Sequence, residues 1–259
     1  MPMLESALFP PHDLTRIASD ALKSWSRCKR QFAYKYVTRL QWPSDARHFS
    51  LGRDVHKLLD YHARGLDCEP LVQEATPAVQ NSWRKLIAHR TVQWPVIANE
   101  WAFHVPITLQ NGTIEWLTGR MDRVARECHD GGPDKIWVID WKTGTGVPRH
   151  AEEDWQTRLY LFALLEVANT PSAADLSLCE HGPLQADDLG FLYVEVKPDT
   201  HTPIREVLIP YSRERHEDTR RLLHTILNAM SVEETYALPG QCPDRYCAYR
   251  TICGIEDNI

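Results

Sequence analysis

The sequence predicts an α/β fold in which a central mixed β-sheet is flanked by helices. Three observations lead to this prediction. Apolar residues recur every three or four positions early in the chain, residues alternate around an Asn-Gly turn in the middle, and short apolar strands lie between two helical segments in the last part. We expect residues 1–18 to form an irregular lead-in and residues 19–259 a single domain.

The first part of the chain is expected to be helical. One helix should begin at Ser19, a residue that favours the N-cap position. Its apolar face carries Leu22, Trp25, Cys28, Phe32 and Tyr36. A second helix is expected over residues 51–65 and a third over residues 76–90.

The middle of the chain predicts a three-stranded antiparallel meander. Residues 100–109 alternate in character, and the following Asn-Gly pair is typical of a tight hairpin turn. Strands are then expected over residues 113–124 and, after a Gly-Gly-Pro turn at 131–133, over residues 135–142. The remaining elements expected are a helix over 152–169, strands over 191–196 and 206–209, and a helix over 213–230.

Composition and charge restrict the possible settings. The 259 residues are 43% hydrophobic and 25% charged, as in soluble globular proteins. No apolar run is long enough to span a bilayer and no secretory signal is visible, so we expect a cytoplasmic protein. The net charge is −6, yet residues 21–60 hold nine Lys and Arg against three Asp. That excess indicates either a phosphate-binding surface or, slightly favoured, a solvated basic helix face.

Two predicted strands carry the residues for a metal site. Residues two apart point to the same side of a strand, so Asp140 and Lys142 share a face, and Asp122 on the paired strand can project beside them. Carboxylates bind hard cations such as Mg²⁺, and a nearby ammonium can stabilise charge on a phosphate. The backbone carbonyl of Trp141 can add a further oxygen ligand. This set suits phosphodiester hydrolysis.

The order Gly119-x-x-Asp122 followed by Asp140-x-Lys142 resembles the catalytic core of the PD-(D/E)XK nucleases. Two further matches are Gly52-x-x-x-His56, which resembles the RecB-type histidine, and Gln156-x-x-x-Tyr160, which resembles the family's Q-x-x-x-Y helix. Each match alone has an ordinary structural explanation, such as an exposed ion pair or a hydrogen-bonded histidine. Their occurrence in one colinear order favours the nuclease interpretation.

The resemblance implies a restriction-endonuclease-like core and a set of roles. Asp122, Asp140 and Lys142 would be catalytic, and His56, Asp122, Asp140 and the Trp141 carbonyl would bind Mg²⁺ or Mn²⁺. Gln156, Tyr160 and Arg120 would contact the substrate or support the site. Glu100 lies where relatives often carry an acidic residue.

Four of the seven cysteines suggest a second metal site. Cys242, Cys247 and Cys253 are closely spaced near the C-terminus, and Cys28 is the obvious fourth ligand. This arrangement resembles the iron–sulfur staple of AddB-like and CRISPR-associated RecB-like exonucleases, which implies a [4Fe–4S] cluster joining the two ends of the chain. The spacing between Cys242 and Cys247 is two residues longer than is usual in these relatives. A structural zinc site is the alternative. The other cysteines, at 68, 128 and 179, are expected to be ordinary thiols.

The resemblance implies a metal-dependent deoxyribonuclease, an exonuclease acting on single-stranded DNA or DNA ends. No nucleotide-binding G-x-x-x-x-G-K-[ST] motif is present, so a helicase or a CRISPR integrase would be a separate partner, in DNA repair, recombination or CRISPR adaptation. Two alternatives remain open. One is a scaffold that binds DNA ends without cutting, and the other is a zinc-stabilised interaction module.

Overall fold

The computed structural model describes residues 16–40, 50–129, 134–144, 146–168, 170, 183–232, 242 and 247–253. The chain divides into two compact units, described separately below. The larger unit takes its described residues from 45–103 and 119–219, and the smaller takes its own from 1–44, 104–118 and 220–259. Three elements contribute residues to both units: β2 (Val96–Thr108), β3 (Ile114–Glu127) and α8 (Arg213–Val232).

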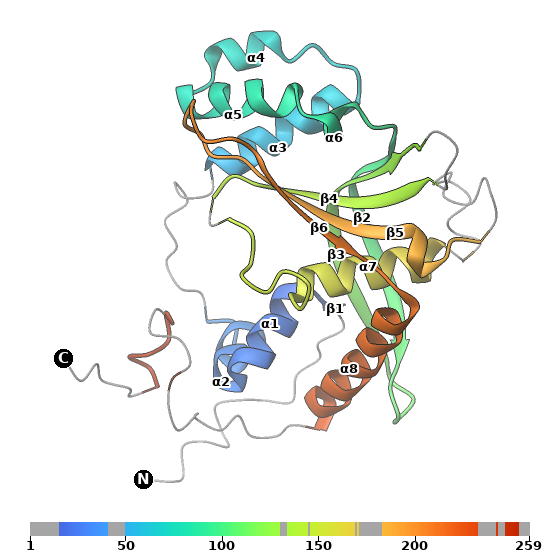
Figure 1. Cartoon of the computed structure of the whole chain (residues 1–259). Coiled ribbons are helices and arrows are strands. Elements are labelled where there is room, and N and C mark those ends of the chain that lie inside the picture. The colour runs from blue at the N-terminus through green and yellow to red at the C-terminus, as the bar shows by residue number, and fades with distance from the viewer. Residues whose placement is uncertain are drawn as a thin grey trace. The chain divides into compact units, whose positions relative to one another are not determined.

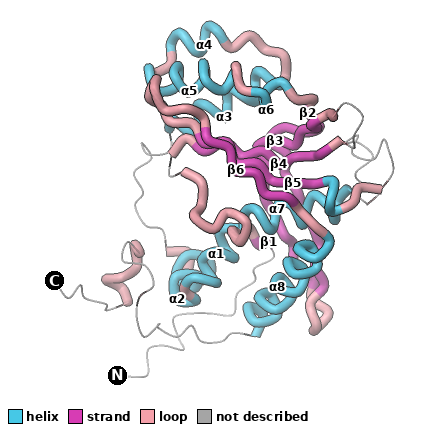
Figure 2. Tube along the Cα trace, in the orientation of Figure 1, coloured by secondary structure: helices cyan, strands magenta, loops and turns pink. Residues whose placement is uncertain are grey.

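A mixed sheet forms the centre of the larger unit (Figure 2). Strands β3, β4 (Lys135–Lys142), β5 (Leu189–Glu195) and β6 (Arg205–Pro210) follow one another in that order. The β4–β5 pair is parallel, whereas β3–β4 and β5–β6 are antiparallel. Strand β2 also pairs with β3. The predicted mixed sheet is therefore confirmed.

Helices cover both faces of this sheet, as the sequence predicts (Figure 1). Strands β4 and β5 are apolar along most of their length and almost completely buried, which is typical of parallel strands covered on both sides. On one face, α3 (Ser50–Ala63) and α5 (Pro77–Ile87) pack against alternate residues of the two strands. On the other face, α7 (Trp155–Ala168) packs against β5 through Tyr160 and Phe191.

The first predicted helix is interrupted in the smaller unit. Helix α1 (Ser19–Arg27) ends at Cys28, which adopts an extended conformation with φ −161° and ψ 112°. A short helix α2 (Lys29–Phe32) and a π-helical turn η1 (Ala33–Val37) follow. The expected N-cap is also wrong by one residue, since Ala18 occupies that position. Apolar spacing predicts which side chains share a face, but it does not predict whether the backbone between them is one continuous helix. Trp25 and Phe32 therefore pack edge to face, with ring centroids 5.1 Å apart, although the helix is interrupted between them.

Other boundaries differ from the predicted ones by a few residues. Thr76 caps α5 by accepting the Val79 N–H at 3.4 Å, but the helix ends at Ile87. Three short helical segments and one short strand were not predicted: α4 (Glu69–Glu74), α6 (Arg90–Gln93), the 3₁₀ turn η4 (Ala186–Asp188) and β1 (Arg16–Ile17), which pairs with β3 in the smaller unit. The predicted turn at 131–133 lies outside the described residues. Within the described part of the chain, no helix has the length and apolar character to cross a membrane.

Candidate metal centre

The site begins where strands β3 and β4 separate. Their ladder ends at the pair Arg123–Ile139. Beyond it, a carboxylate oxygen of Asp122 accepts the backbone N–H of Trp141 at 3.3 Å, in place of a backbone carbonyl. A side chain therefore enters the space between the two strands, and the Asp122 carboxylate is fixed relative to β4.

Helix α3 supplies a histidine to the same place. His56 Nε2 lies 2.9 Å from the Trp141 carbonyl oxygen, and His56 Nδ1 lies 3.5 Å from Asp122 Oδ2. Gly52 allows this close approach, because a Cβ there would lie only 3.1 Å from Thr143 Oγ1. Burial alone would lower the pKa of His56, but Asp122 and the Trp141 carbonyl raise it to about 9. The Trp141 carbonyl, which the sequence analysis predicts as a metal ligand, thus orients the imidazole of His56.

Glu100 on β2 completes a group of potential ligands. One ligand atom from each of His56, Glu100 and Asp122 lies within 4.8 Å of the other two. Glu100 has φ 48°, a left-handed conformation that is strained for glutamate and that marks functional positions more often than chance. Its carboxylate lies 3.1 Å from Arg120 Nε, and burial together with Asp122 raises its pKa. One nitrogen and two carboxylates form a donor set suited to a divalent cation.

Asp140 and Lys142 form a second cluster beside this group. Lys142 Nζ lies 2.8 Å from Asp140 Oδ2, so the two side chains expected on one strand face are in contact. Gln156 on α7 joins them, since its amide donates to Asp140 Oδ1 at 2.5 Å and accepts from Lys142 Nζ at 3.1 Å. Burial and the Asp122 carboxylate raise the pKa of Asp140, whereas Lys142 opposes that rise. The glutamine holds both charged groups in place.

Tyr160 lies one helical turn after Gln156 on α7, and its side chain is buried. Its ring packs edge to face on Phe103 at 5.5 Å. Gly119 allows both rings to approach β3, because a Cβ there would lie 2.6 Å from Phe103 and 3.0 Å from Tyr160. Burial raises the pKa of Tyr160 to about 12. In this position Tyr160 supports the strand that carries Asp122.

Arg123 is a functional candidate that the sequence analysis missed. Its guanidinium is completely buried, donates to Asn99 Oδ1 and to the Leu59 carbonyl at 3.1 Å each, and lies 4.8 Å from the Trp141 ring centroid. Burial lowers its pKa to about 10. Arg123 therefore links α3, β2 and β4 next to the potential ligands. The sequence signal for it is weak, because β3 carries several other charged residues and Arg123 directly follows Asp122.

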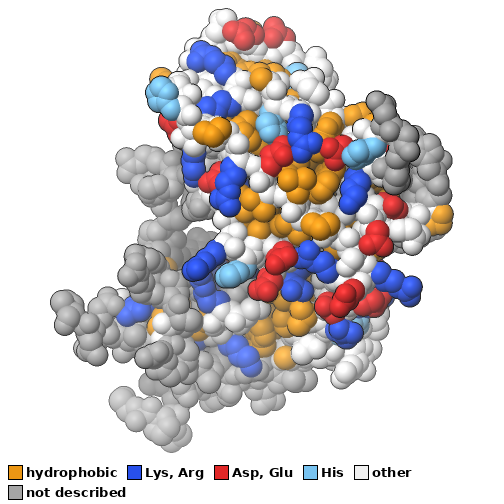
Figure 3. Space-filling view, in the orientation of Figure 1, with side chains coloured by type: hydrophobic (Ala, Val, Ile, Leu, Met, Phe, Trp, Pro, Cys, Tyr) orange, Lys and Arg blue, Asp and Glu red, His pale blue; other side chains and the backbone are white. Residues whose placement is uncertain are grey.

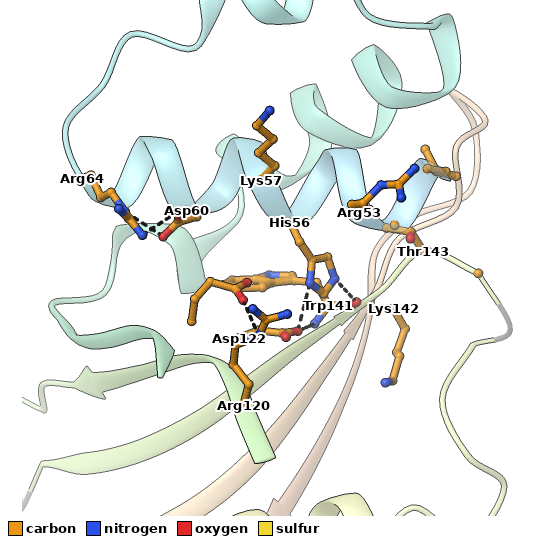
Figure 4. Close-up of a pocket in the computed structure, with 14 residues that line it drawn as sticks. Arg53, His56, Lys57, Asp60, Arg64, Arg120, Asp122, Trp141, Lys142 and Thr143 are labelled. Atoms are coloured by element: carbon orange, nitrogen blue, oxygen red, sulfur yellow. Dashed lines mark hydrogen bonds and ion pairs between the residues drawn. The ribbon is translucent and has the colours of Figure 1, made fainter. Parts of the chain in front are cut away.

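A pocket of about 1030 Å³ opens onto these groups (Figure 4). Its charged lining residues are Arg53, Lys57, Arg64, Arg120 and Lys142, together with Asp60, Glu100 and Asp122. His56 and Asp122 point into it from opposite sides. On the face shown in Figure 3, acidic and basic side chains are interspersed over the helices α3–α6 and the strands β4–β6. Five cations against three carboxylates make the pocket wall suitable for a phosphate group.

The smaller unit contains the four predicted cysteine ligands. Burial raises the pKa of the Cys253 thiol, and the nearby Cys28 and Cys247 contribute to that rise. Gln31 Nε2 lies 3.6 Å from Cys247 Sγ. Cys28 lies where α1 ends, and Cys242 is half-buried. Of the other cysteines, Cys68 is buried and Cys128 is exposed, as expected of ordinary thiols, while Cys179 lies outside the described residues.

The chain belongs to the PD-(D/E)XK nuclease superfamily, whose family model matches residues 16–254. The proteins of this superfamily are nucleases that use divalent metals, and the predicted α/β core agrees with this assignment. A search of curated protein sequences finds no match to the chain.

Several solved structures are similar to it, among them the following two. The crystal structure of SSO0001 has 16% sequence identity and a TM-score of 0.42, and the match covers 93% of this chain and 87% of that one. A protein from Eubacterium rectale named "Putative exonuclease" has 11% identity and a TM-score of 0.48, with 89% and 88% covered.

Proposed function

We propose that this chain is a divalent-metal-dependent deoxyribonuclease that acts as an exonuclease on single-stranded DNA or DNA ends. One observation supports this most strongly. The ligand atoms of His56, Glu100 and Asp122 converge within 4.8 Å, next to the Asp140–Lys142 pair, in a member of a nuclease family. A scaffold that only binds DNA has no need of such a set.

His56, Glu100 and Asp122 would hold Mg²⁺ or Mn²⁺, with Asp140 and the second lone pair of the Trp141 carbonyl as the further ligands expected from the sequence. Such a cation polarises the phosphate and acidifies the attacking water. Lys142 places its ammonium group beside Asp140, where it would stabilise negative charge on the phosphate. Gln156 would hold the Lys142 ammonium and the Asp140 carboxylate in place through its two hydrogen bonds.

The same proposal extends to the cysteines and to the cellular role. Cys28, Cys242, Cys247 and Cys253 would bind a [4Fe–4S] cluster of the AddB type, because the four thiols belong to one compact unit and two of them, Cys28 and Cys247, lie close enough to Cys253 to raise its pKa. Zinc in the same site is the competing assignment. The enzyme would act in DNA repair, recombination or CRISPR adaptation, where a helicase or a CRISPR integrase supplies or receives the strand.

A cleavage assay tests the proposed activity. Protein purified without oxygen is mixed with end-labelled single- and double-stranded DNA, with Mg²⁺, with Mn²⁺ or with a chelator. We expect degradation only with added metal, and an absorbance band near roughly 400 nm from the cluster. Lys142→Ala should lower the rate by about 10²–10³-fold, as loss of one charge-stabilising group does, and should leave folding and DNA binding largely intact.

Lys197→Ala is the matched control, because this lysine also lies close to a strand carboxylate, at 2.7 Å from Glu195, but does not line the pocket. It should cut DNA normally. A Lys142→Ala protein with full turnover would show that the assignment of the centre is wrong. DNA binding without cutting by the unmodified protein would support the scaffold, and zinc without iron in an inactive protein would support the interaction module.

A further inference from the structure

Helix α3 lines one wall of the pocket with polar side chains, of which His56 points toward Asp122 while Lys57 extends away from that pair (Figure 4). These side chains are Arg53, then His56, Lys57 and Asp60, which lie three, four and seven positions after it, and Arg64, which directly follows the helix. Such spacing places side chains on one face of a helix. The opposite face carries the buried Val55, Leu58 and Leu59. The helix therefore brings charged groups to the pocket on both sides of the ligand His56.

Three of the five pocket cations already have a carboxylate partner. Arg64 pairs with Asp60 at 2.9 Å, Arg120 with Glu100 at 3.1 Å, and Lys142 with Asp140 at 2.8 Å. The other two, Arg53 and Lys57, are exposed. Within the ranges that the structure describes, no carboxylate lies within ion-pair distance of either one, and Lys57 Nζ instead lies 5.5 Å from the Tyr61 ring centroid. Their charges remain available to an anion.

We propose that Arg53 and Lys57 bind the phosphates of the nucleic-acid backbone on either side of the phosphate at the metal site. This inference rests on the proposed nuclease function. Arg53 precedes His56 by three residues and Lys57 follows it by one, so about 6 Å of helix axis separates the two cations, at 1.5 Å per residue. The strand would pass along α3, held at two points next to the bond that is cut.

The charge of the whole protein makes such contacts necessary. A net charge of −6 repels a polyanion, so association depends on a local group of cations in the substrate's path. Of the nine Lys and Arg in residues 21–60, these are the two in the described pocket lining. Contacts to phosphate position the strand but do not read its bases, so the enzyme would be indifferent to sequence at these positions.

The test uses Arg53→Gln, Lys57→Gln and the double variant. Binding of a fluorescent single-stranded oligonucleotide is measured with Ca²⁺ in a Lys142→Ala background, over a range of salt concentrations, and cleavage is measured with Lys142 intact. Each single change should weaken binding about fivefold at 0.1 M salt and reduce the slope of log K against log salt by about 0.7, as expected for one lost phosphate contact to a single strand. The Mn²⁺ affinity and the melting temperature should not change, because both side chains are exposed and neither belongs to the proposed metal ligands.

Arg84→Gln is the matched control. Arg84 is exposed on α5, its described hydrogen bond goes only to Asn81, and it does not line the pocket. Its DNA affinity and salt slope should equal those of the parent. If the unmodified protein cuts DNA but the Arg53 and Lys57 variants keep the parental salt slope, the phosphate contacts are refuted and the nuclease function stands. If the variants lose Mn²⁺ affinity, the two cations act on the metal site and the inference is wrong. Weakened binding by the variants of a protein that does not cut would support the contacts and refute the nuclease.

Discussion

Replacing Gly119 by alanine tests how the fold positions Asp122, three residues along the same strand. The new Cβ would lie 2.6 Å and 2.7 Å from two ring atoms of Phe103, and 3.0 Å from Tyr160. Real Cβ contacts are about a full ångström longer, so one ring must move. Neither has space to do so, since Phe103 is 2% and Tyr160 9% exposed. Overpacking of this kind costs about 1–3 kcal/mol, and we expect the free energy of unfolding to fall by that amount.

The measurement is urea denaturation of the metal-free protein. The slope of the unfolding free energy against urea concentration should be the same in the variant and in the parent. Gly144→Ala is the control, because no heavy atom lies within 4 Å of its added Cβ, and it should stay within about 0.5 kcal/mol of the parent. Phe103→Leu, which removes the clashing ring atoms, should recover about 1 kcal/mol when combined with Gly119→Ala. Full stability of Gly119→Ala, or strictly additive costs in the double variant, would refute the close-packing argument.

Two further predictions concern the proposed metal sites. Neighbouring groups raise the pKa of His56 to about 9, above its unfolded value of about 6.5. The charged imidazole therefore stabilises the metal-free fold. This contribution is complete below pH 6.5 and is lost as the pH rises through 9. Mn²⁺ requires the neutral imidazole, so its binding at pH 7.5 should release about one proton, measured by calorimetry in buffers of different ionisation enthalpy, and a heat independent of the buffer would contradict this. Cys28→Ala should lose iron and the visible absorbance band, and it should melt at a lower temperature. Cys128→Ala changes an exposed cysteine and should keep the iron, the band and the melting temperature of the parent. A Cys28→Ala protein that keeps its iron would show that Cys28 is not a ligand.

The sequence predicted the part of the fold that periodicity determines. Alternation and the Asn-Gly turn gave the β2–β3 hairpin, and the apolar runs of β4 and β5 gave strands buried on both faces. Local spacing also placed Asp140 and Lys142 on one face, where the structure brings them into contact. The break at Cys28 was not predictable, because an amphipathic pattern continues through it although the backbone does not.

The remaining features of the site depend on tertiary contacts that no local pattern reports. The left-handed backbone of Glu100 exists only because surrounding structure maintains it. The burial of Arg123 requires acceptors from two other elements, Asn99 on β2 and the Leu59 carbonyl on α3. A strand sequence alone would place that arginine on the surface, since a guanidinium is rarely buried without partners.

The ion pairs of the site have a consequence for how the protein matures. Without a metal, each acidic group of the centre has a cationic neighbour: Asp140 has Lys142, Asp122 has His56, and Glu100 has Arg120. Clustered carboxylates ordinarily repel one another and oppose folding. Here the polypeptide provides its own counter-ions, so the larger unit can reach its final form before any metal arrives. If the proposed function holds, metal supply would then govern when the enzyme works rather than whether it folds.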